Sequence, residues 1–160
     1  MENVLAIDEI PLVNTFQPND SSFEDGLLVI EEAYKKVGFI PDGKIMTSKD
    51  EIAEKLKSAL YGVKTPDGFD KWMLPFSLPG ATFFVTVGQP FAIVPPHAHK
   101  KGSGVKFIVS GSILYGNKEL TSGDWMYVPQ GAEYSFNVGP AGVTIISGYK
   151  DCCSGPPIRP

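Results

Sequence analysis

The sequence predicts a mainly β protein with a partly helical N-terminal extension. Its 160 residues suit one domain. Residues 1–60 carry 12 acidic and 6 basic side chains, whereas residues 61–160 carry 6 and 8. The second part also holds 14 of the 17 glycines and 11 of the 14 prolines. Glycine and proline between short apolar stretches are typical of many short strands, so we expect a β-sandwich or β-barrel there.

Two helical patterns lie in the extension. Ser48 and Glu51 form a capping-box pattern, which predicts a helix over residues 48–62 with apolar side chains on one face. A similar apolar spacing predicts an earlier helix over residues 22–37. Within it, residues 27–30 would also suit a strand.

Short strands without an intervening helix are expected from residue 72 onward. Their predicted ranges are 72–78, 81–87, 91–95, 105–109, 112–115, 125–128, 134–138 and 143–149. Residues 115–118, with Gly-Asn at the centre, are typical of a tight hairpin turn. We therefore divide the chain into an extension over 1–70, a β domain over 71–150 and a proline-rich tail over 151–160.

Charge and hydropathy argue against two classes of partner. The net charge is −4 and the isoelectric point is near 5.1, which does not suit a nucleic-acid binder. No apolar run is long enough to span a membrane. The first residues lack the pattern of a signal peptide, so we expect a cytoplasmic protein. The adjacent Cys152 and Cys153 are expected to have no role in the chemistry.

The chemistry of the chain concentrates at its only two histidines, His97 and His99. In a strand, side chains two residues apart point to the same face. Two adjacent imidazoles provide half of a site for Fe(II), Zn(II), Mn(II) or Ni(II). The alternative is a chance pair on a solvated loop beside Lys100 and Lys101.

The surrounding pattern resembles the two motifs of the cupin superfamily, over roughly residues 80–150. The first motif runs His-x-His, four residues, Glu, six residues, Gly, and the second runs Gly, five residues, Pro-x-Gly, two residues, His. The matching residues are His97, His99, Gly111, Gly123, Pro129 and Gly131. The resemblance implies a cupin-type antiparallel β-barrel, also called a double-stranded β-helix or jelly roll. It also implies a homodimer, because cupins often pair through sheet edges and N-terminal segments.

The chain departs from the motifs at two ligand positions. Gly104 stands at the glutamate position and Tyr134 at the last histidine position. The metal role of the family therefore carries over to His97 and His99 alone. Tyr134 is the best candidate for a third ligand, since a phenolate can bind a metal and a phenol can serve as a catalytic acid or base. A packed tyrosine in a barrel that has lost its metal is the alternative.

The nearby carboxylates are weaker candidates for the third ligand. Asp124 follows Gly123 at the turn between the motifs, where cupins usually carry Gly-Asp for structural reasons. Glu133 precedes Tyr134 and should point the opposite way in a strand.

Large aromatic side chains are expected to line or fill the barrel interior around Tyr134. The predicted pocket residues are Phe83, Phe91, Phe107, Trp125, Tyr127 and Phe136. Such walls would suit a small-molecule substrate with a chelating oxygen edge and an apolar body. Lys100, Lys101 and Lys106 could attract a carboxylate, although we expect them to be solvated.

Three functions are compatible with these residues. The first is metal-assisted non-redox chemistry by a lyase, isomerase or cyclase, on a substrate with a carbonyl or carboxylate group. The second is a dioxygenase that cleaves a carbon–carbon bond in an aromatic ketone or dicarbonyl, for which the missing ligands are unfavourable. The third is a non-catalytic ligand-binding cupin. The expected cofactor is one divalent metal ion (Fe, Zn, Mn or Ni), or none if the histidine pair is a relic.

Overall fold

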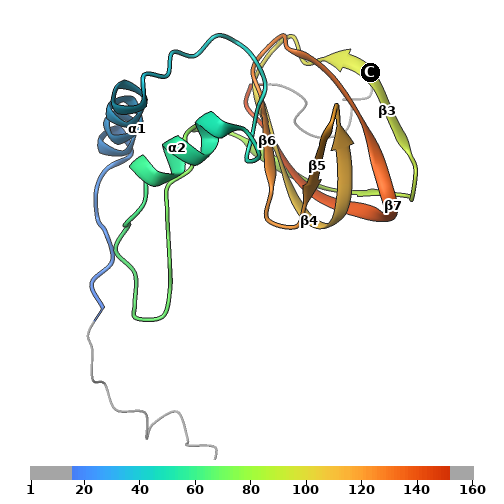
Figure 1. Ribbon diagram of the computed structural model, residues 1–160. Helices are drawn as coiled ribbons and strands as arrows, with labels where there is room; N and C mark the ends of the chain where they lie inside the picture. The colour runs from blue at the N-terminus through green and yellow to red at the C-terminus, as the bar shows by residue number, and fades with distance from the viewer. Residues whose placement is uncertain (1–15, 152–160) are drawn as a thin grey trace, which may run out of the picture.

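A computed structural model describes residues 16–151 and contains an antiparallel sheet of seven strands beside two helices (Figure 1). The elements are α1 (Phe23–Val37), β1 (Met46–Thr47), α2 (Glu51–Ala59), β2 (Thr82–Gly88), β3 (Ile93–Ala98), β4 (Gly104–Tyr115), β5 (Lys118–Thr121), β6 (Trp125–Val128) and β7 (Glu133–Tyr149). The sheet order is β1-β6-β4-β7-β2, while β3 pairs with β7 and β5 pairs with β4. The predicted mainly β fold is confirmed. The sheet is open, because its strand order ends at β1 on one side and at β2 on the other. Figure 1 shows that the open sheet is curled.

Two long bent strands replace two predicted pairs of short strands. The strands predicted within 105–115 are one strand, β4, and those within 134–149 are one strand, β7. Gly111 in β4 has φ 73°, and a Cβ atom there would lie 1.9 Å from the carbonyl oxygen of Gly142 in β7. Only glycine fits this crossing, which has register shifts beside it. These glycines therefore mark bends within strands and not chain reversals.

The strand predicted over residues 72–78 is wrong. Only Trp72 makes a β-bridge, with Tyr61. The rest of this segment packs against the outside of the sheet, where the Phe76 ring lies 4.9 Å from that of Tyr127 and 5.2 Å from that of Trp125. The predicted hairpin joins β4 to β5 as expected. The short strands β1 and β5 were not predicted, because their few residues carry no clear alternation.

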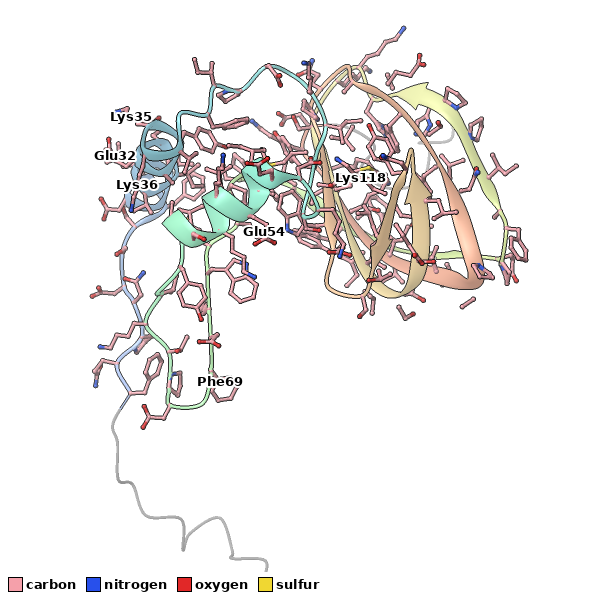
Figure 2. All side chains as sticks on the ribbon, in the orientation of Figure 1. Glu32, Lys35, Lys36, Glu54, Phe69 and Lys118 are labelled. Atoms are coloured by element: carbon pink, nitrogen blue, oxygen red, sulfur yellow. The ribbon has the colours of Figure 1, made fainter. Side chains whose placement is uncertain are left out.

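Helix α1 forms where the sequence predicts it. The Ser22 side chain accepts a hydrogen bond from the Asp25 N–H (3.1 Å), and the Asp25 carboxylate accepts one from the Ser22 N–H (3.3 Å). This capping box fixes the first turn, so the alternative strand over 27–30 is wrong. Figure 2 shows Lys35 and Lys36 on the side of α1 turned away from the sheet.

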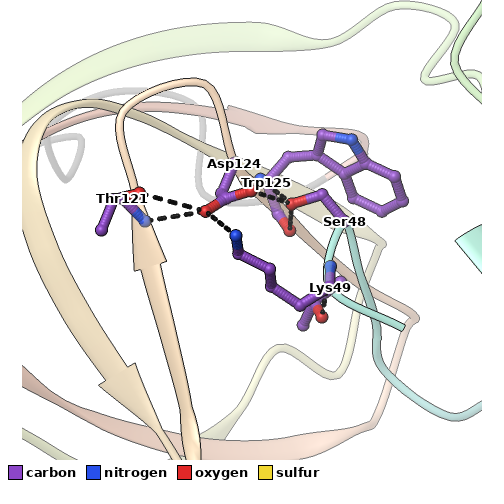
Figure 3. Close-up of polar contacts among 6 residues, drawn as sticks. Ser48, Lys49, Thr121, Asp124 and Trp125 are labelled. Carbon is purple, nitrogen blue, oxygen red and sulfur yellow. Dashed lines mark hydrogen bonds and ion pairs between the residues drawn. The ribbon is translucent and has the colours of Figure 1, made fainter. Parts of the chain in front are cut away.

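The N-cap predicted for α2 is wrong. The helix begins two residues later than expected, with Asp50 at its N-cap. The Ser48 hydroxyl instead donates to Asp124 Oδ1 (2.9 Å) and accepts from the Trp125 N–H (2.9 Å) (Figure 3). Ser48 is therefore used to join the extension to the sheet.

The curled sheet has a core on each face. The interior core consists of Ile108, Ile113, Leu120, Met126, Val128, Tyr134, Phe136, Val138, Val143 and Ile145. The outer core, between the sheet and the helices, consists of Ala33, Met46, Ala53, Leu56, Leu60 and Trp125. We refer to these faces as the interior face and the outer face. Within residues 16–151, no helix has both the length and the apolar character needed to cross a membrane.

The contacts of Asp124 give a first prediction. Its carboxylate accepts from Ser48 and from the Thr121 N–H (2.9 Å), lies 3.5 Å from the Lys49 ammonium, and is only 15% exposed. We expect Asp124→Ala to lower the free energy of unfolding by about 2 kcal/mol, because the partly buried Ser48 hydroxyl and the Thr121 N–H lose a charged acceptor. Urea denaturation measures this loss.

Glu32→Ala is the matched control, since that carboxylate forms an exposed ion pair with Lys35. Its removal should change the free energy of unfolding by less than about 0.5 kcal/mol. Equal losses in the two variants would contradict the joining role of Asp124.

Candidate functional site

Strands β3 and β7 bring the predicted ligand residues together. The two strands pair with His97 opposite Tyr134, so these side chains share one face. His99 follows β3 directly, and its carbonyl oxygen accepts the Gly131 N–H (2.9 Å). The Tyr134 side chain is only 4% exposed. Its Oη atom lies 3.1 Å from Nε2 of His97 and 3.1 Å from Nε2 of His99.

The hydrogen-bond partners define the direction of the bonds in this cluster. Nδ1 of His97 lies 2.8 Å from the carbonyl oxygen of Pro95, which can only accept. Nδ1 therefore carries the hydrogen, and Nε2 of the neutral ring is an acceptor for the Tyr134 hydroxyl. Since a hydroxyl has one hydrogen, Nε2 of His99 donates to the Tyr134 oxygen. The cluster is thus a chain of hydrogen bonds running from His99 through Tyr134 to His97.

The surroundings keep His99 neutral. Its pKa lies below the ordinary value of 6.5, first because the ring is partly buried and then because of repulsion from His97, when that ring is protonated, and from the Lys106 ammonium. An unprotonated imidazole can bind a metal ion or accept a proton. The site therefore holds one neutral base at pH 7.

A second group of polar side chains lies next to the histidines. Lys106 in β4 pairs with Ser147 in β7. Its ammonium donates to the Tyr149 hydroxyl (3.0 Å) and to the Ser147 hydroxyl (3.4 Å), and the residue is only 8% exposed. The Tyr149 ring lies 4.9 Å from the His99 ring. The two groups thus form one polar cluster on the interior face.

Gly104, at the position where the resemblance to the first cupin motif places a glutamate, has little space beside it. A Cβ atom at this position would lie 3.0 Å from Cδ1 of Tyr149 and 3.2 Å from the carbonyl oxygen of Gly148. The Tyr149 ring thus occupies the space beside this position. A larger residue at position 104 would displace that ring from its contact with His99.

The structure separates the aromatic residues predicted to line the interior. Phe136 lies in the interior core, and its ring stacks on that of Tyr134 with centroids 6.2 Å apart. Phe107, Trp125 and Tyr127 lie on the outer face, packed beneath the helices. Phe83 and Phe91 are 66% and 70% exposed. The prediction that these side chains line the interior is therefore wrong for Phe83, Phe91, Phe107, Trp125 and Tyr127. The sequence could not distinguish the two faces of the sheet, because the outer face is also apolar.

The carboxylates and lysines considered in the sequence analysis lie in different environments. Asp124 is engaged with Ser48 outside the interior, and Glu133 is exposed. Lys100 and Lys101 are solvated, as expected. Lys106 is buried, which corrects the expectation that it is solvated.

Sequence reasoning missed Ser147 and Tyr149 as parts of the site. The signal that could have found them is the alternation of polar and apolar side chains along the second half of β7, where Tyr149 and Ser147 share a face with Ile145. Among the described residues, no group of three His, Cys, Asp or Glu side chains could hold a metal ion. Among the described side chains, Tyr134 therefore stays the candidate for a third ligand.

The lowered pKa of His99 gives a second prediction. In protein treated with EDTA, the His99 Cε1 proton should titrate below pH 6.5 in an NMR experiment. Because the unfolded chain binds the proton more tightly, this group makes folding less stable as the pH falls below about 6.5. The His97→Gln variant assigns the resonances and should also raise the pKa of His99, since a neighbour that can become positively charged is removed. A pKa above 6.5 in the native protein would contradict the described environment.

No family model and no curated protein matches the sequence of the chain. Its structure is similar to an RmlC-like cupin from Shewanella frigidimarina, at 24% identity and a TM-score of 0.40, over 45% of this chain and 67% of that one. It is also similar to KdgF from Halomonas sp., at 13% identity and a TM-score of 0.43, over 58% and 88% of the two chains. The curled antiparallel sheet and the turns between its strands carry the residues that resemble the two cupin motifs.

Proposed function

We propose that this chain is a small-molecule enzyme of the cupin type that carries out non-redox chemistry, as a lyase, isomerase or cyclase. Its substrate carries a carbonyl or carboxylate group. The supporting observation is the position of Tyr134 Oη, 3.1 Å from Nε2 of both histidines on the interior face. A phenol held between two imidazoles is placed to transfer a proton.

The donor atoms fit a divalent metal ion. The bond from His97 Nδ1 to the Pro95 carbonyl orients the ring and leaves Nε2 as the ligand atom. His99 is neutral, as a ligand must be. His97, His99 and Tyr134 would hold the ion, and this nitrogen–oxygen set suits Zn(II), Fe(II), Mn(II) or Ni(II). When bound, the ion would polarise a substrate carbonyl.

Tyr134 is the residue we assign to proton transfer. Its hydroxyl gives a proton to a substrate oxygen, or its phenolate takes one from the carbon next to a carbonyl. The burial of Tyr134 excludes bulk water from this exchange. A second proton carrier, Nε2 of His99, is hydrogen-bonded to the same oxygen. Both directions of transfer are therefore available without a redox step.

The metal content of the protein gives a third prediction. Protein purified without a histidine tag should contain about one divalent ion per chain by elemental analysis. A single imidazole binds such ions weakly, so His97→Ala combined with His99→Ala should remove the metal and leave a folded sheet, as judged by circular dichroism. If the double variant keeps its metal, the assigned ligands are wrong.

Proton exchange gives a fourth prediction. We expect the protein to speed the exchange of the C3 protons of pyruvate or 2-oxobutyrate in D₂O, followed by NMR. Tyr134→Phe should slow this exchange at least ~100-fold, which is the usual contribution of a catalytic acid or base. Tyr127→Phe is the matched control, because Tyr127 packs against the outer core, on the other face of the sheet. Equal rates for the two variants would contradict the role of Tyr134.

A further inference from the structure

Among residues 16–151, Lys106 is a buried positive charge that forms no ion pair with a carboxylate. It is 8% exposed and points to the interior face, and its ammonium lies 5.7 Å from the centre of the Tyr134 ring and 5.3 Å from that of Tyr149. Its two hydrogen-bond acceptors are the neutral hydroxyls of Tyr149 and Ser147. An ammonium has three donors, so one remains available to another acceptor.

The acidic side chains of the β domain lie away from this charge. Asp124 pairs with Lys49 and Asp151 with Lys150. The others between residues 61 and 151 are exposed, and they are Asp67, Asp70, Glu119 and Glu133. Among residues 16–151, no carboxylate forms an ion pair with Lys106. Within residues 16–151, the positive charge of Lys106 therefore has no paired carboxylate to balance it.

An ammonium buried without a counter-charge is costly to the folded protein. Such a cost is commonly found at functional sites, where a ligand supplies the missing charge. The neighbouring hydroxyls of Tyr149 and Ser147 hold the ammonium in place and can donate to a second oxygen atom of a ligand. Together the three side chains offer one charged donor and two neutral hydroxyls.

We infer that Lys106, Tyr149 and Ser147 form a binding subsite for the carboxylate group of a small organic acid. This inference rests on the proposed function, because it names the substrate class of the same site. The Tyr149 ring contacts His99, and the Lys106 ammonium lies beside the Tyr134 ring. An acid bound through its carboxylate at Lys106 therefore presents the adjacent carbon and oxygen atoms to Tyr134. Small 2-oxo acids and dicarboxylates carry the carboxylate and the neighbouring oxygen atoms that this subsite would bind.

The test measures binding to metal-free protein, so that it needs neither the metal nor turnover. Pyruvate and malonate are titrated into EDTA-treated protein by calorimetry and compared with pyruvamide and malonamide, which lack the charge. We expect the acids to bind at least tenfold more tightly than the amides. We also expect Lys106→Met to reduce acid binding at least tenfold, and Lys106→Arg to retain part of it.

The control is the double variant Lys100→Met, Lys101→Met, which removes two solvated charges close to the same histidines. It should bind the acids like the native protein. Lys106→Met should also melt at a higher temperature than the native protein in the absence of ligand, because a buried unbalanced charge is removed. A lower melting temperature with unchanged acid binding would overturn the inference and leave Lys106 a structural residue.

The results of the binding and proton-exchange experiments distinguish a failure of the carboxylate subsite from a failure of the proposed enzymatic function. Acid binding that depends on Lys106, in a protein without metal or proton exchange, supports the subsite and counts against the proposed enzyme. Proton exchange that depends on Tyr134 but is unaffected by Lys106→Met supports the enzyme and overturns the subsite. If Lys106→Met fails to fold, Lys106→Gln keeps an amide donor for Tyr149, and its acid binding decides the question.

Discussion

The antiparallel pairing of β4 with β7 determines which side chains meet on the interior face. The bent crossing of the two strands, at Gly111 and Gly142, turns both ends of β7 inward. One end contributes Tyr134, opposite His97 of β3, and the other contributes Tyr149 beside His99. Residues 15 positions apart on one strand thus belong to one cluster. The site depends on this bend more than on any single hydrogen bond.

The two faces of the sheet carry different charged side chains, with Asp124 on the outer face and Lys106 on the interior face. Asp124 satisfies donors on the side of the helices, where it joins the extension to the sheet (Figure 3). The interior holds two imidazoles, two phenols and the Lys106 ammonium. At the position of the motif glutamate, the Tyr149 ring lies against Gly104. Within residues 16–151, an interior that holds the Lys106 cation but no carboxylate paired with it favours an anionic ligand, which connects the proposed chemistry to organic acids.

Much of this arrangement follows from the sequence, and the remainder depends on packing. The spacing of His97 and His99 and the motif position of Tyr134 identified the residues that the structure brings together. Alternation could not show which face of β6 is interior, because the extension makes both faces apolar, and Trp125 was therefore misplaced. Lys106 looked like a solvated lysine, since burial of a charge depends on neighbours from β7 that no local pattern reveals.

A crystal structure of the protein grown with zinc and malonate would test the central claim most directly. The account predicts zinc between Nε2 of His97 and Nε2 of His99, and one malonate carboxylate within hydrogen-bond distance of the Lys106 ammonium. The other end of malonate should approach Tyr134. Malonate bound only at Lys100 or Lys101, with histidines that hold no zinc, would contradict it.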